Sequence, residues 1–196
     1  DLQAHRQDDA RVRDLDNSES PSAMAFSPLG DYLFVALQGH DEVLVFDALA
    51  VGVDPRQQGI VGRHPVGAAP QGLLVSGGAE PWLLTRSLSR QSLSGLLDGP
   101  GGLGAASSPS TTAHEPLAAD VLAGKRLFHR ASDPRISLEG YLSCATCHAD
   151  GGSDGRVWDF TGRGEGLRNN IDLRGRAGTA HGAVHWTANF DEIQDF

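Results

Sequence analysis

The sequence predicts a mixed fold, with antiparallel β-sheet in the first half of the chain and a mainly α-helical domain after it. Short apolar runs separated by tight turns fill the first half, and their pattern recurs after about 49 residues. A stretch with helical periodicity comes later, shortly before a Cys-x-x-Cys-His motif. The 25 glycines and 10 prolines among 196 residues indicate many turns and argue against a helical bundle.

The first strands are predicted from apolar runs of strand length. These runs cover residues 23–26, 32–37 and 43–46, and the turn-rich stretches 27–31 and 38–41 separate them. Strands that follow one another so closely, joined by tight turns, form an antiparallel meander.

An internal repeat follows the meander. Residues 21–26 have a counterpart in 70–75, and residues 32–35 have one in 81–84. This period fits a four-stranded unit with an insertion, which we place at residues 51–59.

Three pieces of this region resemble the β-propeller repeats called YVTN repeats. They are residues 27–36 (SPLGDYLFVA), 43–47 (VLVFD) and 66–73 (VGAAPQGL). The resemblance covers about residues 20–98 and implies antiparallel β-propeller-like blades, about two in number. A closed propeller needs at least about four blades, so we expect a partial propeller whose earlier blades are missing or belong to another chain. The alternative is a small two-sheet β-domain.

The domain boundary is predicted where glycine, serine and proline dominate. Residues 99–115 form this linker, so the sequence divides into a β-domain at 1–98, the linker, and a second domain at 116–196. The second domain begins with a helix predicted over 116–129, where apolar residues follow a helical stripe.

Cys144, Cys147 and His148 form a Cys-x-x-Cys-His motif, which is the attachment sequence of haem c. Each thiol can form a thioether to one vinyl group of the porphyrin, and the adjacent histidine is predicted to be the proximal iron ligand. The chain has only these 2 cysteines. A redox-active thiol pair and half of a zinc site are the alternatives.

Four pieces around this motif resemble the first haem domain of the di-haem cytochrome c peroxidase and MauG-like family. They are residues 124–128 (GKRLF), 133–137 (DPRIS), 142–148 (LSCATCH) and 168–175 (RNNIDLRG). The resemblance runs from about residue 118 to the last residue. It implies a mainly α-helical cytochrome c domain at 116–196 that is incomplete at its C-terminal end, with a second haem in missing sequence.

The resemblance also assigns a role to Trp186, since a tryptophan late in this domain lies between the two haems of the family. Trp186 is therefore predicted to relay electrons, with haem-pocket packing as the alternative. For the distal side of the iron we predict His185 or His181, or else a vacant site or a ligand from missing sequence. Arg174 and Arg176 are candidates for pairing with the haem propionates, or for surface salt bridges.

Net charge and hydropathy limit which partners and which cellular location are expected. The formal net charge is -9, so the surface repels nucleic acid and anionic membranes and favours a basic redox partner protein. No apolar run approaches the roughly 18 residues of a membrane-spanning helix. Because haem c is attached outside the bacterial inner membrane, we expect an exported protein, periplasmic or extracellular. Its precursor is then expected to carry a signal peptide that this sequence does not contain, either because it was removed or because the N-terminus is not the native one.

The predicted function is outer-sphere electron transfer through one covalent haem. One alternative is that the chain is part of a di-haem, peroxidase-like oxidoreductase. The other is a propeller interaction module whose haem is structural.

Overall fold

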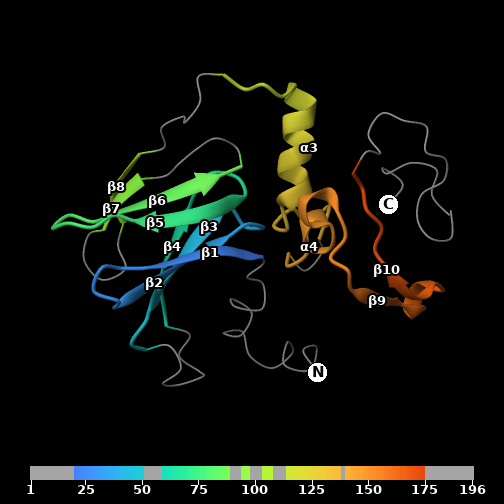
Figure 1. Ribbon diagram of the computed structural model, residues 1–196, viewed down its shortest axis with the longest axis horizontal. Helices are drawn as coiled ribbons and strands as arrows, with labels where there is room; N and C mark the ends of the chain where they lie inside the picture. Colours follow the sequence, from blue (N-terminus) through green and yellow to red (C-terminus); the bar gives the residue numbers. More distant parts are fainter. Residues whose placement is uncertain are drawn as a thin grey trace. The chain divides into compact units, whose positions relative to one another are not determined.

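The computed structural model describes residues 20–50, 59–88, 94–97, 103–107, 114–137 and 140–174 (Figure 1). The chain divides into two compact units, with the boundary between Ser143 and Cys144. In these described ranges the first unit contains two antiparallel sheets and a helix, and the second contains short helical turns and a β-hairpin. The predicted order of sheet before helix is confirmed. Within the described ranges no helix is long and apolar enough to span a membrane.

The first sheet contains four antiparallel strands whose spatial order follows the chain. They are β1 (Pro21–Phe26), β2 (Tyr32–Leu37), β3 (Glu42–Asp47) and β4 (Ile60–Pro65). The three strands predicted from apolar runs are confirmed, with bounds that differ by at most two residues. Most of the predicted insertion, residues 51–58, lies outside the described part of the chain.

The second sheet repeats this arrangement. Its four antiparallel strands are β5 (Pro70–Val75), β6 (Trp82–Ser87), β7 (Ser94–Leu97) and β8 (Leu103–Ser107). Strand β8 lies inside residues 99–115, which composition assigned to a linker. The prediction was wrong for this strand, because pairing with β7 uses backbone groups that even a segment as poor in apolar residues as LGAAS supplies. The described residues show two such sheets and no closed propeller.

The first hairpin turns of the two sheets share two hydrogen bonds. The Ser27 N–H donates to Tyr32 O at 2.9 Å, and the Ser76 N–H donates to Trp82 O at 2.9 Å. Each serine hydroxyl also accepts the N–H of the residue that begins the next strand, at 3.0 Å from Tyr32 and at 2.8 Å from Trp82. The repeat predicted from sequence is therefore a structural repeat for residues 21–26 and 70–75. The second strands are offset by 50 residues and not by 49, so Tyr32 corresponds to Trp82 and the predicted match of 32–35 with 81–84 was wrong by one residue.

The entries into the two sheets match too. Ser20 and Ala69, which precede β1 and β5, both have a positive φ, of 52° and 50°. Each residue accepts a hydrogen bond through its carbonyl from the residue that ends the first hairpin, Gln38 at 3.1 Å and Leu88 at 3.1 Å. A bulge follows in each first strand, between Pro21 and Ala23 in β1 and between Pro70 and Gly72 in β5.

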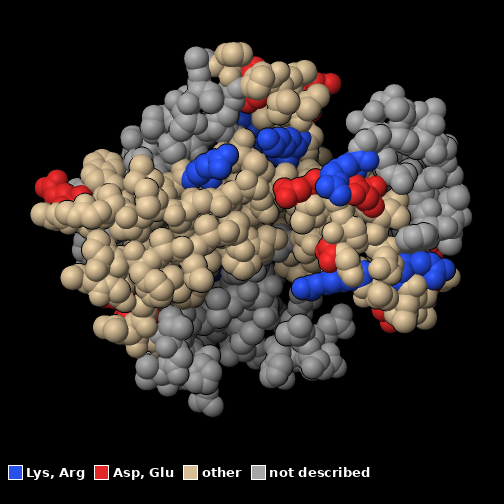
Figure 2. Space-filling view, viewed as in Figure 1, with Lys and Arg blue, Asp and Glu red and all other residues tan. Residues whose placement is uncertain are grey.

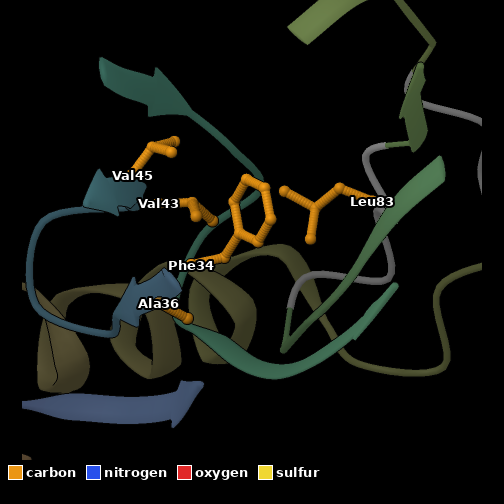
Figure 3. Close-up of a cluster of buried hydrophobic side chains, with 5 residues drawn as sticks. All are labelled: Phe34, Ala36, Val43, Val45 and Leu83. Carbon is orange, nitrogen blue, oxygen red and sulfur yellow. The ribbon is translucent and has the colours of Figure 1, made fainter. Parts of the chain in front are cut away.

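The core lies between the two sheets, where side chains of alternate strand positions meet (Figure 3). Leu83 of β6 points toward Phe34 of β2 (Figure 3), and both are 1% exposed. The remaining members of the buried cluster are Ala36, Val43 and Val45. Strands β1 and β5 lie side by side, and the Ser22 hydroxyl donates to Pro70 O at 2.6 Å.

Helix α3 (Ala119–His129) begins three residues later than predicted and ends where predicted. No side chain caps its N-terminus, and Glu115 accepts the Leu117 N–H at 3.1 Å in the turn before the helix. Beyond the helix, the N–H groups of Ala131 and Ser132 both donate to Gly39 O, at 2.9 and 3.2 Å. These bonds join the helix to the β2–β3 turn, so it belongs to the compact unit of the sheets and not to the unit of the Cys-x-x-Cys-His motif.

Over residues 144–174, the part of the second unit that the structure describes, the chain is less helical than expected. Its elements are α4 (Cys144–Cys147), η1 (Ala149–Gly151), β9 (Val157–Phe160), η2 (Thr161–Arg163) and β10 (Gly166–Asn169). Strands β9 and β10 pair as an antiparallel hairpin that the sequence analysis did not predict. The β-branched and aromatic residues Val157, Trp158 and Phe160 were an available signal for it.

Candidate haem-attachment site

The two cysteines occupy the first and last positions of α4, a single helical turn. Residues three apart in a helix lie on the same face, so the turn places both thiols on one side. Ala145 anchors the turn because it is the residue of α4 that is buried. No disulfide joins Cys144 and Cys147.

The ionisation of Cys144 argues against an activated redox thiol. Partial desolvation around its sulfur raises the pKa of the Cys144 thiol above the ordinary value, although the residue as a whole is exposed. Thiols that act in exchange reactions have a lowered pKa, since the thiolate is the reactive form.

His148 follows the helix, and its N–H donates to Cys144 O at 2.9 Å. Its ring Nδ1 lies 3.0 Å from Gly152 O. A backbone carbonyl only accepts, so Nδ1 carries the proton of this hydrogen bond. In the neutral imidazole the other nitrogen, Nε2, then has a free lone pair, which is the form that a metal requires.

The C-terminal end of α4 is held by two other segments of the same unit. The carbonyl of Cys147 accepts the Asp154 N–H at 3.1 Å and also a hydrogen bond from Asn170 Nδ2. The Leu173 N–H donates to Gly151 O at 2.8 Å. The stretch at 168–175, which the sequence analysis associated with the haem motif, therefore contacts the motif itself.

Arg174 lies over the glycines that follow the motif. A Cβ atom added at Gly151 would come within 3.4 Å of Arg174 Cγ, and one added at Gly152 would come within 3.5 Å of its guanidinium. The guanidinium also forms an ion pair with Asp172, and 68% of the Arg174 side chain is exposed. A haem propionate that bound Arg174 would therefore share the guanidinium with the carboxylate of Asp172.

The structure brings together Cys144, Cys147, His148 and Arg174 in one unit. The remaining predicted site residues, His181, His185, Trp186 and Arg176, lie outside the described residues. The sequence analysis did not predict the role of Gly152, because its backbone oxygen makes the contact and no sequence pattern indicates it. Asn170 lies in the stretch that resembles the haem family, but the sequence analysis assigned it no role.

In the part of the chain that the structure describes, no group of three or more His, Cys, Asp or Glu side chains is arranged to hold a metal ion. A zinc site built on the two thiols would therefore take further ligands from residues that are not described. Two cysteines on one helical turn that form no disulfide, followed by an oriented imidazole, fit the covalent attachment of haem c.

A scan against protein-family models and a search of the curated proteins both find no match to this chain.

Proposed function

We propose that this chain is an exported electron-transfer protein that carries one haem c on Cys144, Cys147 and His148. The observation that carries the proposal is the hydrogen bond between His148 Nδ1 and Gly152 O, 3.0 Å long, directly after two cysteines that share a single helical turn and form no disulfide. This arrangement supplies both attachment atoms and an imidazole in its ligating tautomer.

The residues of the site have distinct tasks in this proposal. Cys144 and Cys147 would form the two thioethers, and His148 would offer Nε2 to the iron. Gly152 O holds the imidazole ring, which increases the basicity of the ligating nitrogen. Haem c, when bound, supplies a one-electron iron couple whose potential depends on its axial ligands, burial and hydrogen bonds.

We also propose that the two sheets are neighbouring blades of β-propeller type. The matched hairpin turns, the matched positive φ values and the matched bulges support this reading, because they repeat with the sequence period. The resemblance to YVTN repeats agrees with this reading. That resemblance and the one to the first haem domain of di-haem peroxidases both remain predictions. The same holds for the periplasmic or extracellular location and for the basic redox partner, which the net charge of -9 favours.

The attachment is tested by exporting the chain from a bacterium that has the machinery for c-type cytochrome maturation. We expect the intact mass of the purified protein to show one covalent haem and its reduced spectrum in pyridine to show haem c. The double variant C144S/C147S should carry no covalent haem, and each single variant should keep at most one thioether. The variant T146S is the matched control inside the motif. Wild-type protein without covalent haem, or with one tightly bound zinc, would contradict the proposal.

Electron transfer is distinguished from peroxidase activity by two measurements on the haem-loaded chain. We expect a reversible one-electron redox titration and no turnover of peroxide, because peroxide chemistry in the resembling family needs a second haem. Sustained peroxide turnover by the chain alone would favour the enzyme alternative.

A further inference from the structure

The lysine and arginine side chains of the first unit that the structure describes fall into two groups. In one group each cation forms an ion pair with a carboxylate: Arg63 with Glu42, Arg130 with Asp41, and Arg135 with Asp133. In the other group are Arg86, Lys125 and Arg126, which form no ion pair with any described residue. We call these three residues the basic patch.

Two members of the basic patch border a shallow hollow on the surface of the first unit. One side of the hollow is formed by three residues of α3 and the other by three residues of the second sheet and its entry: Leu122, Lys125 and Arg126, and Ala68, Ala69 and Leu88. Positions i, i+3 and i+4 lie on one face of a helix, so a single face of α3 is turned toward this sheet. Figure 2 shows Lys and Arg side chains over α3 and over the end of β6, with uncharged residues between them.

Arg86 extends the basic patch along β6. It precedes Leu88 by two residues, and alternate residues of an extended chain point to the same side, about 7 Å apart. The Leu88 N–H donates to Ala69 O at 3.1 Å, so the extended pairing continues as far as the hollow. Arg86 is exposed, whereas Thr85 and Ser87 on either side of it are buried.

Folding of the first unit does not account for the basic patch. Like charges repel one another, and for the other three cations a neighbouring carboxylate offsets the charge. Between the patch residues, Leu88 and Leu122 are only half-buried. The chain as a whole has a formal net charge of -9, so the positive charge here is local. A group that carries carboxylates and a small apolar surface would complement both properties.

We infer that the basic patch binds an acidic segment of a partner protein, in which carboxylate side chains flank a short apolar one. The carboxylates pair with the three cations, and the apolar side chain lies over Leu88 and Leu122. The hollow is shallow, so it suits an extended segment and not an enclosed ligand. The haem takes no part in this contact, and a basic redox partner would use a different surface. The inference therefore stands or fails independently of the proposed function.

A nucleic acid fits the basic patch less well. Three cations neutralise few phosphates, and the rest of a long polyanion would extend over a chain with a net charge of -9. A short acidic segment interacts mainly with the patch itself, because charges more than about 8–10 Å away are screened at physiological salt.

The test uses the full chain and follows Lys125, which is the single lysine of the sequence. Reductive methylation with carbon-13 formaldehyde gives its side chain an NMR signal and keeps its charge. The variant K125R identifies that signal beside the one from the N-terminus. The probe is the peptide EEVEE, capped at both ends, and we expect it to cause a saturable shift that about 1 M salt abolishes. The peptide EEGEE should bind more weakly, and KKVKK should cause no shift.

Substitutions that spare the reporter distinguish the patch from net charge. R86Q and R126Q each remove an exposed, unpaired cation, so each should weaken EEVEE binding by up to about fivefold, and both together by about tenfold. R63Q is the matched control, because it changes the net charge equally but removes a guanidinium that is paired with Glu42. It should change binding by less than about twofold. Circular dichroism verifies that each variant is folded.

Three results would overturn the inference. One is the absence of a saturable shift of the Lys125 signal up to about 5 mM EEVEE. Another is equal weakening by R63Q and by R86Q/R126Q, since net charge alone would then explain the binding. The third is tighter binding of a single-stranded oligothymidylate than of EEVEE at the same salt concentration, which would assign the patch to nucleic acid.

Discussion

The carboxylate of Asp41 and the guanidinium of Arg130 form an ion pair of 3.0 Å that ties the end of α3 to the β2–β3 turn. Asp41 also accepts the Ala69 N–H at its Oδ1, at 2.8 Å, and the Val66 N–H at its backbone carbonyl, at 2.7 Å. Its backbone has a positive φ of 58°. One residue thus joins the first sheet, the entry into the second sheet and the helix.

We predict that the hydrogen bond of Asp41 matters more to stability than its charge. D41A removes the acceptor for Ala69 and should lower the free energy of unfolding by about 1–3 kcal/mol. D41N keeps an acceptor at Oδ1, and asparagine tolerates the positive φ. D41N and R130M should therefore each lower the free energy of unfolding by at most about 1 kcal/mol. Urea unfolding measures these differences. Equal losses for D41A and D41N would show that the ion pair dominates.

The two faces of the first sheet give a matched pair of phenylalanines. F34A removes a side chain that is 1% exposed and should lower the free energy of unfolding by about 3–5 kcal/mol. F26A removes one that is 58% exposed and should change it by no more than about 0.5 kcal/mol. Thermal or urea unfolding of both variants provides the check. A loss for F26A as large as that for F34A would contradict this prediction.

His40 should make the first unit less stable in mild acid. Partial burial lowers the pKa of His40, and the charge of Arg63 acts in the same direction, while Glu42 and Asp41 oppose it. Among the described residues its Nδ1 has no hydrogen-bond partner. The folded state therefore resists protonation, and stability falls as the pH drops below the ordinary histidine pKa of about 6.5.

H40Q tests this prediction because it removes the titration. Between about pH 7.5 and about pH 5.5 the wild type should lose more stability in urea unfolding than H40Q does. Parallel pH profiles for the two proteins would assign the acid sensitivity to other groups.

Asn170 should support the attachment turn. Its Nδ2 donates to Cys147 O, while its Oδ1 accepts the Ser153 hydroxyl at 2.6 Å. N170D keeps the shape and loses the donor, so we expect a lower yield of covalent haem per polypeptide and faster amide exchange at His148. S153A leaves the bond to Cys147 in place and should show neither change. Amide exchange at His148 reports on the turn itself, so it tests the role of Asn170 even if no haem is attached.

The accuracy of the sequence predictions depends on whether side chains or backbone groups determine each element. Strands β1–β3 have apolar side chains that alternate or cluster, and the repeat of β1 in β5 follows from them. Strand β8 is held by backbone pairing and was missed. At the site, the motif identified Cys144, Cys147 and His148 because their chemistry resides in side chains. The support from Gly152 comes from a backbone oxygen, which no sequence pattern reveals.

The hydrogen bonds around α4 have a consequence for maturation. Protein groups close the turn on both sides, through Gly152 at the imidazole and through Asp154 and Asn170 at Cys147 O. The position of the two sulfurs is therefore set by hydrogen bonds from groups of the same unit. If haem is attached as we propose, the yield of thioether formation depends on residues outside the Cys-x-x-Cys-His motif as well as on the motif itself.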